Sequence, residues 1–91
     1  MYRVKLTRQA LKDAKLIAAT KLQNKVDKII TELKTNPYSS TYNMEKLKFD
    51  LNGCYSKRIT LQHRLIYSVD EKNKIIVIHG MWTHYEKVKK Y

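Results

Sequence analysis

The fold is constrained most strongly by three strand-like runs in the C-terminal half of the chain, which are joined by connections of only two or three residues. The runs cover residues 54–60, 63–70 and 74–80, and they follow Asn52-Gly53, a strong turn signal. Connections this short join neighbouring strands as antiparallel hairpins, because a parallel crossover needs roughly a dozen residues or more. The sequence therefore predicts an antiparallel meander.

The N-terminal half adds one strand and a first helix. Apolar and basic residues alternate over residues 2–6, which is the period of a half-buried strand. Thr7 can cap a helix that begins at Arg8. We expect the apolar face of this helix to carry three residues at helical spacing, namely Leu11, Ala14 and Ala18.

A second helix follows directly. Thr20-Lys21-Leu22-Gln23 matches a capping box and predicts its start, and Asn36-Pro37 ends it. Its predicted core-facing stripe consists of Leu22, Val26, Ile29, Ile30 and Leu33. The whole pattern predicts a single α+β domain over residues 1–91, in which one strand and two helices precede a meander that completes a four- to five-stranded sheet.

The charge of the chain points to an anionic partner. Nineteen Lys and Arg against eight Asp and Glu give a net charge of +11, which costs self-repulsion in a compact domain. Nucleic acid, an acidic protein and an anionic membrane are the ordinary targets. The sequence contains no run of about 18 apolar residues that could span a bilayer, and the first residues lack the apolar core of a signal peptide. We therefore expect a cytoplasmic protein that does not use a membrane.

Metal or cofactor chemistry is not expected. Cys54 is the only cysteine, so it can form neither an internal disulfide nor a cysteine-based metal site. A nucleophilic role for Cys54 lacks a supporting motif, and a small half-buried side chain in a strand is the simpler interpretation. His63 and His79 also fit ordinary strand positions.

The hairpin formed by residues 54–60 and 63–70 carries the most informative local feature. With a turn near Leu61, Arg58 and Arg64 fall opposite each other and share one face of the hairpin. Like charges at opposed positions destabilise a sheet, so the arrangement makes sense if an anion binds between them. The forked guanidinium group suits phosphate oxygens well. The alternative is a pair of solvated or salt-bridged arginines in another register.

Family resemblance adds to this pattern. Three stretches of the chain resemble the YoeB/Txe toxins of the RelE/ParE superfamily. They are Glu45-Lys46-Leu47-Lys48, residues 51–59 and His63-Arg64-Leu65-Ile66-Tyr67. The family pattern E-x-L, L-x-G-x-Y-S-R-R-I and H-R-L-V-Y is met with two conservative changes, Lys57 and Ile66. The closing Trp82-Thr83-His84-Tyr85 is similar to the ending of the Txe branch.

The resemblance implies a ribosome-dependent mRNA endonuclease with a RelE-like fold. It implies that Glu45 is the general base, that Arg58 and Arg64 stabilise the phosphate, that His84 is the general acid, and that Tyr85 orients the substrate. Lys46, Lys48, Lys57 and Trp82 would contact RNA. The products would be a 2′,3′-cyclic phosphate and a 5′-hydroxyl end, with no metal required. Residues 86–91 extend beyond the ending of many relatives, and we interpret them as a solvated basic tail.

The resemblance also implies the partners. These are mRNA on the ribosome and an antitoxin similar to YefM/Axe proteins, whose acidic C-terminal segment the +11 charge would attract. A homodimer is compatible with the family. Two other functions stay open at this stage: a ParE-like poison of DNA gyrase, which shares the fold but not this Glu/Arg/His set, and a catalytically inactive module that binds RNA or antitoxin.

Overall fold

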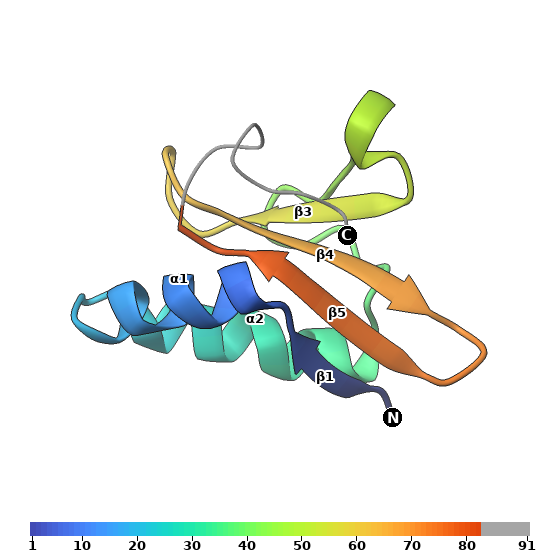
Figure 1. The fold of residues 1–91 in the computed structure, drawn as a ribbon, viewed down its shortest axis with the longest axis horizontal. Helices are drawn as coiled ribbons and strands as arrows, with labels where there is room; N and C mark the ends of the chain where they lie inside the picture. The colour runs from blue at the N-terminus through green and yellow to red at the C-terminus, as the bar shows by residue number, and fades with distance from the viewer. Residues whose placement is uncertain (83–91) are drawn as a thin grey trace.

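The computed structural model describes residues 1–82 and shows two helices packed on one face of a five-stranded sheet (Figure 1). In chain order the elements are β1 (Arg3–Leu6), α1 (Arg8–Ala18), α2 (Gln23–Thr35), β2 (Glu45–Lys46), the 3-10 helix η1 (Phe49–Leu51), β3 (Cys54–Arg58), β4 (Arg64–Asp70) and β5 (Ile75–Gly80). The predicted α+β class and order of elements are confirmed. In this described part of the chain, no helix is long and apolar enough to cross a membrane.

The sheet has the strand order β1-β5-β4-β3-β2. Strands β3, β4 and β5 form the predicted antiparallel meander, and β1 lies parallel to β5 at one edge. The other edge is β2, a strand of two residues that pairs with β3 and that the sequence did not predict. Gly53 takes a φ of 93° in the turn before β3, a conformation that glycine adopts at no steric cost.

Alternating side chains give the sheet two different faces. The main core joins the helices to the face that they cover, called here the helix face, through residues that include Ile17, Val26, Ile29, Leu33, Leu65, Tyr67, Ile76 and Ile78. The opposite face, called here the distal face, carries a smaller apolar cluster of Leu47, Leu51, Cys54 and Ile66. Polar and charged side chains beside this cluster supply the candidate site.

Helix α1 begins as predicted, but two of the three residues predicted for its apolar face are exposed. The Thr7 hydroxyl accepts a hydrogen bond from the Ala10 amide at 3.1 Å, which caps the first turn. The buried residues are Ala10, Asp13 and Ile17. Of the three predicted residues, Ala14 is partly buried against the core, whereas Leu11 and Ala18 are exposed. The stripe is shifted because the buried Asp13 carboxylate accepts the backbone N–H of Met81 at 3.0 Å, which ties this face of the helix to the end of β5.

Helix α2 does not use the predicted capping box. Thr20 closes the preceding turn instead, since its hydroxyl donates to the Ile17 carbonyl at 2.7 Å and accepts from the Leu22 amide at 3.1 Å. The helix begins at Gln23 without a side-chain cap. Its core stripe and its end at Asn36 are confirmed.

The turn between β4 and β5 is tied to the opposite end of the chain through Glu71. Its carboxylate accepts hydrogen bonds from the Tyr2 hydroxyl at 2.8 and 2.9 Å, from the Lys74 ammonium at 2.8 Å, and from the Tyr38 hydroxyl. Hydrogen bonds from Lys74, Tyr38 and Tyr2, in that order, lower the pKa of Glu71 to about 2. This cluster joins Tyr2, which precedes β1, to the loop after α2 and the β4–β5 turn.

We expect this cluster to make stability depend on pH in the acid range. Because the folded-state pKa of Glu71 lies below its ordinary value of 4.5, its stabilisation is complete above that pH and is lost as the pH falls towards 2. The urea midpoint of the wild type should exceed that of Glu71→Gln near neutral pH, and the difference should shrink over this window. A difference that stays constant down to the lowest pH would contradict the role of Glu71.

Candidate functional site

Two arginines face each other at the end of the β3–β4 hairpin. Arg58 and Arg64 are direct partners in the antiparallel ladder, as the sequence predicted. The Arg58 amide points away from β4 and donates to the Tyr42 carbonyl, while the Ile59 amide donates to the His63 carbonyl at 2.9 Å. This pattern makes the arginines a non-hydrogen-bonded pair, the geometry in which opposed side chains come closest.

Glu45 joins the two arginines across the sheet. It pairs with Ser56 on β3, two residues before Arg58, so the ladder places its side chain on the same distal face. Its carboxylate lies 3.7 Å from Arg64 Nη1, an ion pair that spans β3. The middle position is the buried Ser56, whose short side chain leaves room for a β2 carboxylate and a β4 guanidinium to meet.

The environment of this cluster favours an anion over bulk water. The Arg58 side chain is partly buried, and its Nε atom is buried with no hydrogen-bond partner in the structure of residues 1–82. The Arg64 side chain is only 20% exposed, whereas Glu45 is 51% exposed. A partly buried guanidinium group without an anionic partner is costly, so an anion bound beside Arg58 would stabilise the protein.

The structure does not bring two of the predicted RNA-contacting lysines into this cluster. Lys46 pairs with Tyr55, and Tyr55 packs on the helix-face core, so the alternation of β2 places Lys46 on the face opposite to Glu45. Lys48 lies just beyond β2 at the start of η1, where it is exposed. Its neighbour Leu47 packs in the distal cluster, and the structure of residues 1–82 shows no contact between the exposed Lys48 side chain and the arginine pair.

The predicted RNA contact of Lys57 is wrong. The sequence predicted that it contacts RNA, but its side chain is 0% exposed. Its ammonium is held by the loop between α2 and β2 and by Glu32, 3.3 Å away. A lysine buried in this way cannot reach an RNA bound on the distal face.

The end of β5 leads towards the predicted acid. Trp82 stacks on His63, with ring centroids 4.5 Å apart, and its carbonyl oxygen is bonded to the His63 ring. Trp82 is partly buried, so only part of its indole is available for contact with RNA. His84 and Tyr85, the predicted acid and orienting residue, and the tail over residues 86–91 lie outside the described residues.

One exposed aromatic residue near the site was missed. Phe49 is 92% exposed and has a left-handed φ of 57°, although Leu47 and Leu51 on either side of it are buried. A bulky residue in this region is strained and depends on its surroundings to hold it there. The sequence signal was an aromatic residue next to lysine in the segment that follows Glu45.

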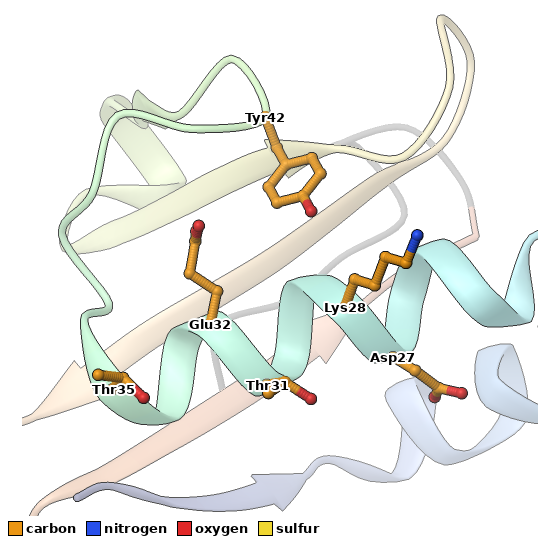
Figure 2. Close-up of a pocket in the computed structure, with 6 residues that line it drawn as sticks. All are labelled: Asp27, Lys28, Thr31, Glu32, Thr35 and Tyr42. Carbon is orange, nitrogen blue, oxygen red and sulfur yellow. The ribbon is translucent and has the colours of Figure 1, made fainter.

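A shallow open hollow lies elsewhere, on the helix side (Figure 2). It is lined by Asp27, Lys28, Thr31, Glu32, Thr35 and Tyr42. None of these residues belongs to the distal face, so the hollow is separate from the arginine cluster. Among residues 1–82, no three His, Cys, Asp or Glu side chains form a group that could hold a metal ion.

The distal-face cluster has a defined chemical capacity. Two guanidinium groups at closest ladder spacing can hold two oxygens of one phosphate and stabilise charge that develops on it. The neighbouring Glu45 carboxylate can accept a proton from a hydroxyl beside that phosphate. This combination suits phosphodiester chemistry.

Comparisons with known proteins point the same way. The sequence profile of the YoeB-like toxins of bacterial type II toxin-antitoxin systems matches residues 6–85. The toxin YoeB of Escherichia coli O6:H1 (strain CFT073) is 34% identical over 56 residues, which cover 62% of this chain and 67% of that protein. A heterotetrameric YoeB–YefM complex from Staphylococcus aureus has a TM-score of 0.79 at 30% identity, covering 93% of this chain and 99% of that one. The YoeB dimer from S. aureus has a TM-score of 0.80 at 30% identity, covering 92% and 98%.

We expect inorganic phosphate to stabilise the protein through the two arginines. Binding to the folded state alone raises the melting temperature, so phosphate should raise the Tm of the wild type above its value in chloride of equal ionic strength. Arg58→Met should lose most of this increase, while Lys12→Met, which removes an exposed charge on α1, should keep it. Equal phosphate-dependent shifts in both variants would exclude a specific site at Arg58.

Proposed function

The chain belongs to the YoeB-like toxins of bacterial type II toxin-antitoxin systems, and on that premise we propose that it is an endoribonuclease that cleaves mRNA on the ribosome. The observation that carries the proposal is the Glu45–Arg64 ion pair beside the opposed Arg58, whose Nε atom lacks a protein partner in residues 1–82. A carboxylate beside two such guanidinium groups is what cleavage of RNA by its own 2′-hydroxyl requires. A poison of DNA gyrase, the alternative function, would not need a carboxylate next to two opposed arginines.

The reaction begins with the proton of the 2′-hydroxyl. Glu45 takes this proton, and the 2′-oxygen attacks the adjacent phosphorus. The half-exposed position of Glu45 leaves its carboxylate accessible to the ribose. Arg58 and Arg64 bind the non-bridging oxygens, and their hold strengthens as negative charge builds in the transition state.

The second proton goes to the leaving group. His84 donates it to the departing 5′-oxygen, and Tyr85 orients the nucleotide, both assigned from the family pattern. The P–O5′ bond breaks as the P–O2′ bond forms, which leaves a 2′,3′-cyclic phosphate and a 5′-hydroxyl end. Because side chains supply every proton and every charge in this route, it needs no metal ion.

The net charge of the chain and several exposed side chains would help to hold RNA. The charge of +11 attracts the phosphate backbone. Lys48 is exposed next to Phe49, whose exposed ring offers a flat face on which an unpaired base can stack. Trp82 could contribute through the exposed part of its indole.

Partners follow from the same family. YoeB of S. aureus forms a complex with YefM and also a dimer, and we propose that this chain binds a YefM-like antitoxin with an acidic C-terminal segment and can pair with a second copy. The positive charge favours the acidic segment for the same reason that it favours RNA. An enzyme that acts on translating ribosomes would work in the cytoplasm.

The site assignment predicts a specific loss of cleavage. Arg64→Met removes one of two groups that stabilise the transition state, so we expect the cleavage rate of a ribosome-bound mRNA to fall by about 100-fold. His84→Gln and Glu45→Gln should also lower the cleavage rate. The Lys12→Met variant, changed at an exposed position of α1, should cleave at the wild-type rate. Primer extension on a translated message measures the cuts.

Two outcomes would overturn the proposal. Wild-type rates in Arg64→Met would refute the site, and gyrase-linked DNA breaks without mRNA cuts would refute the activity. Antitoxin binding, measured in parallel, controls for folding, because a variant that still binds its antitoxin with normal affinity has kept its overall structure.

A further inference from the structure

Lys57 is a fully buried cation whose ammonium is completely occupied. Its Nζ atom donates to the carbonyl oxygens of Ser39 at 2.9 Å and Thr41 at 3.0 Å, and to their hydroxyl oxygens at 3.2 and 3.0 Å. The Glu32 carboxylate lies 3.3 Å away. Since a buried charge is costly without such partners, the position of Lys57 depends on this loop and the loop depends on Lys57.

The partners of Lys57 fasten the loop between α2 and β2 to the helix. Glu32 on α2 also accepts hydrogen bonds from the Ser39 hydroxyl at 2.8 Å and from the Thr41 hydroxyl. Burial, the largest single effect, raises the pKa of Glu32, but hydrogen bonds from Thr41, Ser39 and Lys57 outweigh it and the net pKa is lowered. The carboxylate is thus held in its charged form opposite the buried ammonium.

The same loop continues directly into the candidate site. Figure 2 shows Tyr42 reaching from the loop over α2, on the side from which Glu32 and Lys28 rise. Tyr42 and Asn43 both take left-handed φ values, 54° and 52°, so the chain turns sharply just before β2 begins at Glu45. The Tyr42 carbonyl accepts the Arg58 amide at 2.6 Å, which holds the last residue of β3.

We propose that Lys57 is a positioning residue for the distal-face cluster. From the helix face it fixes Ser39 and Thr41. Through the adjacent Tyr42 it fixes the backbone of Arg58 on one side and the start of β2, with Glu45, on the other. The inference rests on the proposed function for its effect on RNA cleavage, and it replaces the predicted RNA contact with an indirect role.

Kinetics of three variants test this role. Lys57→Met keeps the length of the side chain but donates no hydrogen bond, so we expect kcat for ribosome-bound mRNA to fall by about 100-fold, the cost of roughly 1 Å of misplacement, with KM unchanged. Lys57→Arg, which keeps the charge and several donors, should recover most of the rate. Ile29→Val, a control that loosens the same helix in the core, should keep the wild-type kcat.

Hydrogen exchange tests the structural half of the proposal without relying on activity. In Lys57→Met the Arg58 amide should exchange faster than in the wild type, while the amides of Ile76 and Ile78 on β5 should not. If Lys57→Met does not fold, Thr41→Val removes one side-chain acceptor of the ammonium and should change Arg58 exchange and kcat in the same direction by less.

The outcomes separate the possible failures. An Arg58 amide that stays protected in both Lys57→Met and Thr41→Val would overturn the positioning role whatever the activity. A rise in KM alone would show that Lys57 contacts RNA and would also overturn it. A wild-type protein that cuts no RNA, together with faster Arg58 exchange in the variant, would refute the proposed function while leaving the positioning of Arg58 intact.

Discussion

The direct opposition of Arg58 and Arg64 is the constraint around which the distal face is organised. Two like charges at closest ladder spacing repel each other, and only part of this repulsion is offset by Glu45, which pairs with Arg64. Burial of the apolar residues of β4 excludes a slip by one residue, which would send Leu65 and Tyr67 to the wrong face, and the short turn after β3 sets the register in which the two arginines are opposed. The fold therefore holds a concentrated positive charge that an anion would relieve.

Alternate side chains of β3 have different roles on the two faces of the sheet. Ser56 and Arg58 face the distal side, where the short serine lets Glu45 and Arg64 meet across the strand. Between them in sequence, Lys57 faces the helices and is buried among oxygen atoms of the loop after α2. Neighbouring basic residues in one motif thus have opposite environments: Arg58 is available to a ligand, and Lys57 supports the framework.

The hairpin could be predicted from sequence because its information is local. Period-two alternation and a short turn determine the register of Arg58 and Arg64 without help from distant residues. Glu45 could not be placed in this way, since β2 is two residues long and its position comes from the loop before it. Family resemblance supplied that residue. The burial of Lys57 was missed because its acceptors lie 16 to 18 residues away in an irregular loop, and the α1 stripe was missed because Asp13 is buried by its bond to Met81 at the other end of the chain.

Binding of the scissile phosphate by Arg58 and Arg64 can be tested with a crystal structure of the protein and a short RNA whose 2′-hydroxyl is methylated at the cleavage position and therefore cannot attack. We expect a phosphate between the side chains of Arg58 and Arg64, within hydrogen-bonding distance of both, with the blocked 2′-oxygen facing the Glu45 carboxylate. A phosphate bound elsewhere, with the Arg58–Arg64 pair unoccupied at saturating RNA, would contradict this expectation.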